Sequence, residues 1–126
     1  MQVAKRILVT DDDPAILCLV ATILRRADYE VDTAASGLEA IEKTQRTQYD
    51  AIVLDLMMPI MSGLDVLARL AVRTTRPRFV VIMSAAPLDM IGRTSGHNVF
   101  AALQKPAAIH EIVATVHACL AADSHV

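Results

Sequence analysis

The strongest constraint on the fold is the alternation of short apolar runs with helical patterns along the whole chain. Strands are expected where an apolar run is bracketed by turn residues, and helices where apolar residues recur every three or four positions. The expected strands are Arg6–Thr10, Glu30–Ala34, Ala51–Asp55, Phe79–Met83 and Phe100–Gln104. A helical pattern follows each of them. Such alternation is typical of a parallel sheet covered by helices.

Capping residues mark where the helices begin. Asp13, Ser36 and Ser62 are residue types preferred at the helix N-cap, and each serine precedes an acid by three positions, as in a capping box. The expected helices run from Pro14 to about Ala27, after Ser36 to about Arg46, after Ser62 to about Val72, from Pro87 onwards, and over Ile109–Leu120. The fourth is the weakest, because Gly92 and Gly96 lower its helix propensity.

Five strands and five helices in strict alternation, with right-handed crossovers, predict a three-layer α/β sandwich. The strand order 2-1-3-4-5, which is flavodoxin-like, is the commonest arrangement at this size. The 126 residues fit one domain that spans 1–126. In such a sheet the carboxyl ends of the strands lie at one edge, where ligands bind.

Charge and hydropathy exclude several kinds of partner. With 12 basic and 14 acidic residues the formal charge is −2, so the basic surface expected of direct nucleic-acid binding is missing. No apolar run reaches the roughly 18 residues of a membrane span, because Asp55 interrupts the longest one. The N-terminus also lacks the apolar region of a signal peptide. We therefore expect a cytoplasmic protein without membrane insertion.

Polar side chains follow the apolar strands at the same predicted edge. Asp11 and Asp12 follow the first strand, Asp55 ends the third, Ser84 follows the fourth and Lys105 the fifth. Because the first and third strands are neighbours in the predicted order, the three carboxylates should converge, and their repulsion implies a cation. Oxygen ligands without histidine or cysteine favour Mg²⁺, with Mn²⁺ as the alternative.

A carboxylate in such a place can also be a nucleophile that accepts a phosphoryl group. That chemistry needs a metal, a cation and hydrogen-bond donors around the transferred oxygens. Lys105 can supply the cation and Ser84 a hydroxyl group. Each is an ordinary residue on its own, but together with the strand-end aspartates they predict a phosphoryl site.

Four stretches of the chain resemble the receiver domains of two-component response regulators. They are Ile7–Asp13, Val53–Gly63, Met83–Ala85 and Lys105–Pro106. The resemblance spans nearly the whole chain and implies a phosphorylation switch rather than an enzyme with an external substrate. Its implied partners are a sensor histidine kinase or a histidine phosphotransfer protein, and a downstream protein target.

The resemblance also implies a role for each site residue. Asp55 would accept the phosphoryl group. Asp12, Asp55 and the backbone carbonyl of Met57 would bind Mg²⁺ directly, and Asp11 would help through water. Ser84 and Lys105 would hold the phosphoryl oxygens.

The backbone N–H groups of Met57 and Ala85 would complete the phosphoryl contacts. The Lys105–Pro106 bond is expected to be cis, as in similar domains. Ser84 is also an expected switch residue.

The chain departs from the family pattern where the switch would be read. Receivers usually carry an aromatic residue three positions before the lysine, and this chain has Ala102. Phe100 would share its face by the strand period and is a weak substitute, with core packing as the preferred interpretation. Ala107 replaces the usual aromatic after Lys-Pro. The segment Ile91–Asn98 is therefore expected to carry the change at the face formed by the fourth helix, fifth strand and fifth helix.

Two other functions are compatible with parts of this pattern. An aspartate-nucleophile phosphatase typically needs a second acid two residues after the nucleophile, where this chain has Met57. A degenerate receiver used as an unphosphorylated scaffold would not need the complete set of Asp11, Asp12, Asp55, Ser84 and Lys105. A homodimer through the last helix or the face of the fourth helix is compatible with the apolar composition.

Overall fold

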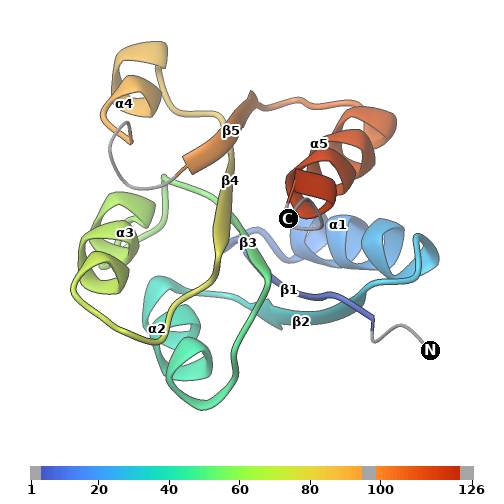
Figure 1. Cartoon of the computed structure of the whole chain (residues 1–126). Helices are drawn as coiled ribbons and strands as arrows, with labels where there is room; N and C mark the ends of the chain where they lie inside the picture. The colour runs from blue at the N-terminus through green and yellow to red at the C-terminus, as the bar shows by residue number, and fades with distance from the viewer. Residues whose placement is uncertain (1–3, 95–98, 123–126) are drawn as a thin grey trace.

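The computed structural model describes residues 4–94 and 99–122, and their backbone forms five strands that alternate with five helices (Figure 1). The strands are β1 (Arg6–Thr10), β2 (Glu30–Ala34), β3 (Ala51–Leu54), β4 (Phe79–Ser84) and β5 (Val99–Gln104). The helices are α1 (Pro14–Arg26), α2 (Gly37–Arg46), α3 (Gly63–Ala71), α4 (Leu88–Gly92) and α5 (Ile109–Ala122). All neighbouring strands are parallel, in the order β2-β1-β3-β4-β5. The predicted fold class and strand order are confirmed.

Side-chain caps explain why three of the helices begin where they do. Asp13 accepts hydrogen bonds from the first backbone N–H groups of α1. Ser62 and Asp65 form a complete capping box at the start of α3. At α2 only one of the two capping-box bonds forms, in which the Ser36 hydroxyl accepts from the N–H of Glu39. The Glu39 carboxylate accepts from the N–H of Ala35 instead of that of Ser36.

The core consists of two apolar layers on opposite faces of the sheet, with α1 and α5 on one face and α2, α3 and α4 on the other (Figure 1). Alternate residues of each strand point to opposite faces, so every central strand contributes to both layers. In β3, for example, Ile52 and Leu54 pack on the α2 and α3 side, and Ala51 and Val53 on the α1 and α5 side. All four are buried, which explains the unbroken apolar run in the sequence.

A bulge in β5 contradicts the expected position of Phe100. Val99 and Ala101 pair with consecutive residues of β4, so Phe100 between them is an extra residue. The Phe100 ring packs edge-to-face on Phe79, whose side chain belongs to the apolar layer under α1 and α5. Ala102 instead pairs with a β4 residue whose side chain belongs to the layer on the opposite face of the sheet. A one-residue slip exchanges the faces of a strand. Phe100 therefore does not share the face of Ala102, and at 41% exposure it is not a core residue either.

The remaining differences from the sequence prediction are small. β3 ends one residue earlier than expected, and β4 includes Ser84. α4, for which the sequence predicts the lowest helix propensity, is the shortest of the described helices, with five residues and no side-chain cap at Pro87. Residues 95–98 of the proposed switch segment Ile91–Asn98 lie outside the described residues. No helix within the described ranges is long and apolar enough to span a membrane.

Candidate functional site

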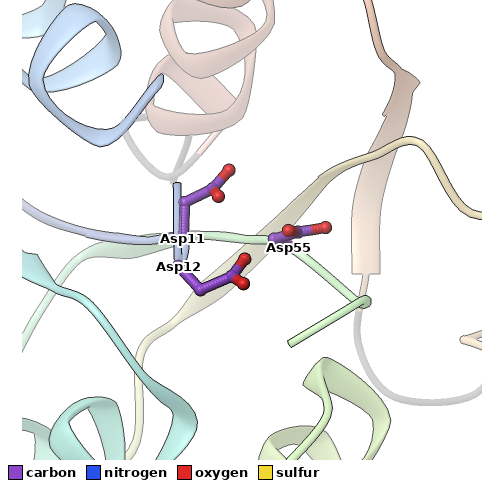
Figure 2. A group of neighbouring side chains, drawn as sticks. All are labelled: Asp11, Asp12 and Asp55. Atoms are coloured by element: carbon purple, nitrogen blue, oxygen red, sulfur yellow. The ribbon is translucent and has the colours of Figure 1, made fainter. Parts of the chain in front are cut away.

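Three carboxylates meet at the carboxyl ends of β1 and β3. Asp11 and Asp12 follow β1 and Asp55 follows β3. One carboxylate oxygen from each lies within 4.8 Å of the other two, and Figure 2 shows the three side chains directed into the same space. Asp11 and Asp55 are buried and Asp12 is exposed, so the group opens to solvent on one side.

Lys105 supplies a positive charge within this group. Its ammonium Nζ lies 2.7 Å from Asp11 Oδ2 and 3.4 Å from Asp55 Oδ2. The lysine follows β5, the edge strand, and reaches carboxylates at the ends of β1 and β3. A side chain from the sheet edge thus bridges two carboxylates at its centre.

Two further donors hold the other oxygen of Asp55. The Ser84 hydroxyl donates to Asp55 Oδ1 at 2.8 Å, and the backbone N–H of Met57 donates to the same oxygen at 3.2 Å. Ser84 is fully buried at the end of β4. The Asp55 carboxylate is therefore surrounded by an ammonium, a hydroxyl and an amide, all of which are oriented toward its oxygens.

Burial and the contacts between Lys105 and the carboxylates shift the pKa values of Asp11 and Lys105. Burial raises the pKa of Asp11, and its hydrogen bonds with Lys105 and the N–H of Asp13 oppose that effect only in part. Burial alone would lower the pKa of Lys105, but the hydrogen bond to Asp11 and the charges of Asp55 and Asp11 raise it overall. Lys105 is therefore charged at neutral pH. One lysine does not balance three neighbouring carboxylates, which leaves a surplus of negative charge.

The donor set fits Mg²⁺. Asp11, Asp12 and Asp55 offer hard carboxylate oxygens at the spacing of a shared ion, and Mg²⁺ typically uses one or two carboxylates together with water and phosphate oxygens. The exposed position of Asp12 leaves room on the solvent side for such ligands.

Of the other residues predicted from the sequence, some lie next to the carboxylates and others lie away from them. Ala85 is exposed and directly follows Ser84, but the backbone N–H that contacts the serine hydroxyl, at 3.2 Å, belongs to Ala86. The Lys105–Pro106 bond is cis, as expected. Ala102 is exposed. Phe100 is directed toward Phe79, at the opposite end of the sheet from the carboxylates.

Gly63 matters for the geometry of the site, although the sequence predicts no role for it. Gly63 is the last residue of the Val53–Gly63 stretch, and its N–H donates to the carbonyl of Leu56 at 2.9 Å. A Cβ atom at this position would lie 2.3 Å from the backbone oxygen of Asp55 and 2.7 Å from Cα of Leu56. The start of α3 therefore lies directly against the backbone that carries Asp55, which is a reason for glycine there.

Comparison with known proteins agrees with the fold and identifies the family. The family model described as the response regulator receiver domain matches residues 7–117. The chain belongs to this family. The receiver domain is 36% identical over 118 residues to the probable transcriptional regulatory protein TcrX of Mycobacterium tuberculosis, a match that covers 90% of this chain and 49% of that protein. The chain thus spans about half the length of the curated relatives it matches.

Solved structures show the same fold. A CheY-like receiver domain from Methanospirillum hungatei superimposes with a TM-score of 0.89 at 24% identity, covering 97% of this chain and 98% of that one. TrrA of Thermotoga maritima, solved in complex with Mg²⁺ and BeF, superimposes with a TM-score of 0.78 at 30% identity, covering 91% and 98%. The receiver domain described above therefore has the architecture of its relatives over nearly all of its length.

Proposed function

We propose that this receiver domain is a phosphoacceptor switch in which Asp55 takes a phosphoryl group from a sensor histidine kinase or a histidine phosphotransfer protein. The observation that carries the proposal is the set of donors around the Asp55 carboxylate: the Lys105 ammonium, the Ser84 hydroxyl and the Met57 amide. Preorganised donors of this kind stabilise charge on oxygens during phosphoryl transfer.

In this mechanism an Asp55 oxygen attacks phosphorus, and the bond from phosphorus to the donor's histidine nitrogen breaks. The electron pair of that bond stays on the nitrogen. Lys105 and Ser84, which contact the free carboxylate in this structure, then bind the phosphoryl oxygens. The backbone N–H groups of Met57 and Ala85 are the other proposed phosphoryl contacts. The domain modifies itself and turns over no external substrate.

Mg²⁺ is the proposed cofactor, with Asp12, Asp55 and the Met57 carbonyl as direct ligands and Asp11 acting through water. Bound there, the ion would neutralise charge on the attacking carboxylate and the phosphoryl oxygens. The complex of TrrA with Mg²⁺ and BeF supports this assignment by relationship.

The output is proposed to be a change of protein contacts at the face formed by α4, β5 and α5, with a downstream protein or a second copy as partner, in the cytoplasm. The relatives are named as transcriptional regulators, so a transcriptional output of the whole protein is part of the proposal. The net charge of −2 favours placing any DNA contact outside residues 1–126. The exposed Ala102 makes the route of the switch unusual, because no aromatic ring stands there.

The proposal is tested by intact mass spectrometry after incubation with a small phosphodonor such as acetyl phosphate. With Mg²⁺ present, we expect a mass increase of one phosphoryl group, stable in acid and labile in base. With a chelator in place of Mg²⁺, the adduct should be absent. No adduct under either condition would favour the scaffold function over the switch.

Replacing Lys105 with methionine should slow adduct formation by about 10²–10³-fold, the effect of losing one preorganised electrostatic contact. The substitution removes the only cation that contacts both Asp11 and Asp55 among the described residues. The initial rate of adduct formation measures it. Lys43→Met is the matched control, because Lys43 lies on α2 and pairs with Glu39 and the Thr33 carbonyl instead. Equal rates for the two variants would contradict the role of Lys105.

The side chain of Met57 is expected to shield the phosphoryl group from water. It is 53% exposed and lies two residues after Asp55. Met57→Gln should accelerate loss of the adduct about tenfold. This is less than the rate increase of about 10²–10⁴-fold that a well-positioned general acid or base provides, because an exposed amide orients water only loosely. Met57→Leu, which keeps an apolar cover, should leave the half-life unchanged. The half-life of the phosphoryl adduct is measured by mass spectrometry after the phosphodonor is removed. Equal half-lives for the two variants would contradict shielding by Met57.

A further inference from the structure

An apolar groove opens beside the phosphoryl site, between α1, α5 and the segment that follows β5. Its volume is about 420 Å³, within the range of roughly 300–1,000 Å³ of small-molecule sites. Ile16, Leu19 and Val20 of α1 form one wall, and Met83 of β4 and Ile112 of α5 also line it. Every one of these side chains is apolar.

Lys105 belongs both to this groove and to the phosphoryl site. Ala85, which follows Ser84, also lines the groove. The same Lys105 ammonium contacts the carboxylates of Asp11 and Asp55. A ligand in the groove would therefore lie among apolar side chains and beside the lysine that contacts the nucleophile Asp55.

The groove is open to solvent because one of the residues that line it is small and another is exposed. Ala107, the second residue after Lys105, is a small side chain that lines the groove without filling it. Leu19, which also lines the groove, is 50% exposed. Covering these surfaces with an apolar group would remove them from water.

We propose that the groove binds the hydrocarbon chain of an acyl phosphate longer than acetyl phosphate, so that such compounds are preferred small phosphodonors. The inference rests on the proposed function of Asp55. Charge complementarity supports this ligand class, because an anionic phosphoryl head suits the Lys105 ammonium, and an alkyl tail suits the remaining lining.

The chemical step is the same phosphoryl transfer with a different leaving group. An Asp55 oxygen forms a bond to phosphorus, and the bond from phosphorus to the acyl oxygen breaks. The acyl group leaves as its carboxylate with the electron pair of that bond. No proton or electron is transferred, and Mg²⁺ is the only other component.

The experiment compares acetyl, butyryl and hexanoyl phosphate, whose acyl phosphate bonds are chemically alike. Formation of the Asp55 adduct is followed by intact mass spectrometry at a series of donor concentrations with Mg²⁺. The concentration that gives half the maximal rate should fall about two- to fourfold for each added methylene, as expected for burial in a partly open groove. The maximal rate should change little.

Two variants test whether the groove is responsible. Ala107→Phe fills it, and Leu19→Gln makes its exposed wall polar with little risk to folding. Each should reduce the advantage of hexanoyl over acetyl phosphate at least severalfold. Ala118→Phe, on the exposed side of α5, should keep that advantage.

The outcomes separate this inference from the function on which it rests. Equal half-saturating concentrations for the three donors, with an Asp55-dependent adduct from each, would overturn the groove as an acyl site and leave the switch intact. A chain-length preference that survives both Ala107→Phe and Leu19→Gln would also overturn it. No Asp55-dependent adduct from any donor would overturn both.

Discussion

Replacing Asp55 with asparagine is expected to abolish the phosphoryl adduct completely. The asparagine amide is nearly the same size as the carboxylate, and its carbonyl oxygen can still accept the hydrogen bonds from Ser84 and Met57. It is not a nucleophile toward phosphorus under these conditions. Intact mass spectrometry with acetyl phosphate and Mg²⁺ measures the loss.

The same substitution should not reduce stability, and this separates a chemical role from a structural one. Asp55 is buried beside Asp11, so removal of the Asp55 charge relieves the repulsion between the two carboxylates. Lys105 keeps its ion pair with Asp11, which is the shorter of its two contacts. We expect the thermal unfolding midpoint of Asp55→Asn to equal or exceed that of the unmodified protein. A lower midpoint together with a missing adduct would attribute the loss to unfolding.

Asp13→Asn is the matched control for Asp55→Asn. Asp13 carries the same functional group, is exposed and caps α1 through its side chain. Asparagine caps helices about as well as aspartate. Adduct formation in this variant should be unchanged, and an equal loss in both variants would show that the assay reports something other than modification of Asp55.

Replacing Gly63 with alanine should give the largest stability loss among the single substitutions considered. The new Cβ would lie 2.3 Å from the backbone oxygen of Asp55 and 2.7 Å from Cα of Leu56. Neither atom can turn aside as the end of a flexible side chain can, so the backbone has to move. Overpacking of this kind costs about 3 kcal/mol. Urea unfolding at equilibrium measures the change in the free energy of unfolding.

The displaced backbone at Gly63→Ala is the one that carries Asp55, so adduct formation should slow as well, under conditions where the variant is folded. Gly92→Ala is the control, because no atom lies within 4 Å of a Cβ at that position. It should be neutral or stabilise the protein by up to about 1 kcal/mol, since alanine restricts the unfolded chain. Similar unfolding curves for both variants would show that the contact at Gly63 relaxes at little cost.

The position of the carboxylates could be predicted because it depends on topology alone. Once Arg6–Thr10 and Ala51–Leu54 are neighbouring parallel strands, the residues that follow them must lie at one edge of the sheet. Apolar runs and helix patterns determine that topology, and both are local properties of the sequence. The same logic placed Ser84 and Lys105 at the ends of the adjacent strands.

The position of Phe100 could not be predicted in this way. The strand period assumes an uninterrupted ladder, and the bulge between Val99 and Ala101 resets it. Whether a strand bulges depends on how it pairs with β4 and packs against Phe79, which is a matter of contacts between distant segments.

By itself, then, the sequence determined the fold class, the strand order and the identity of the residues at the carboxyl edge, because hydrophobic periodicity and strand alternation are local signals. Only the tertiary structure decided which groups touch. It paired Lys105 with Asp11 more closely than with Asp55, placed Gly63 against the Asp55 backbone and left an open apolar groove beside Ala107. These features depend on distances of a few ångströms between segments far apart in the chain, which side-chain packing and burial set together.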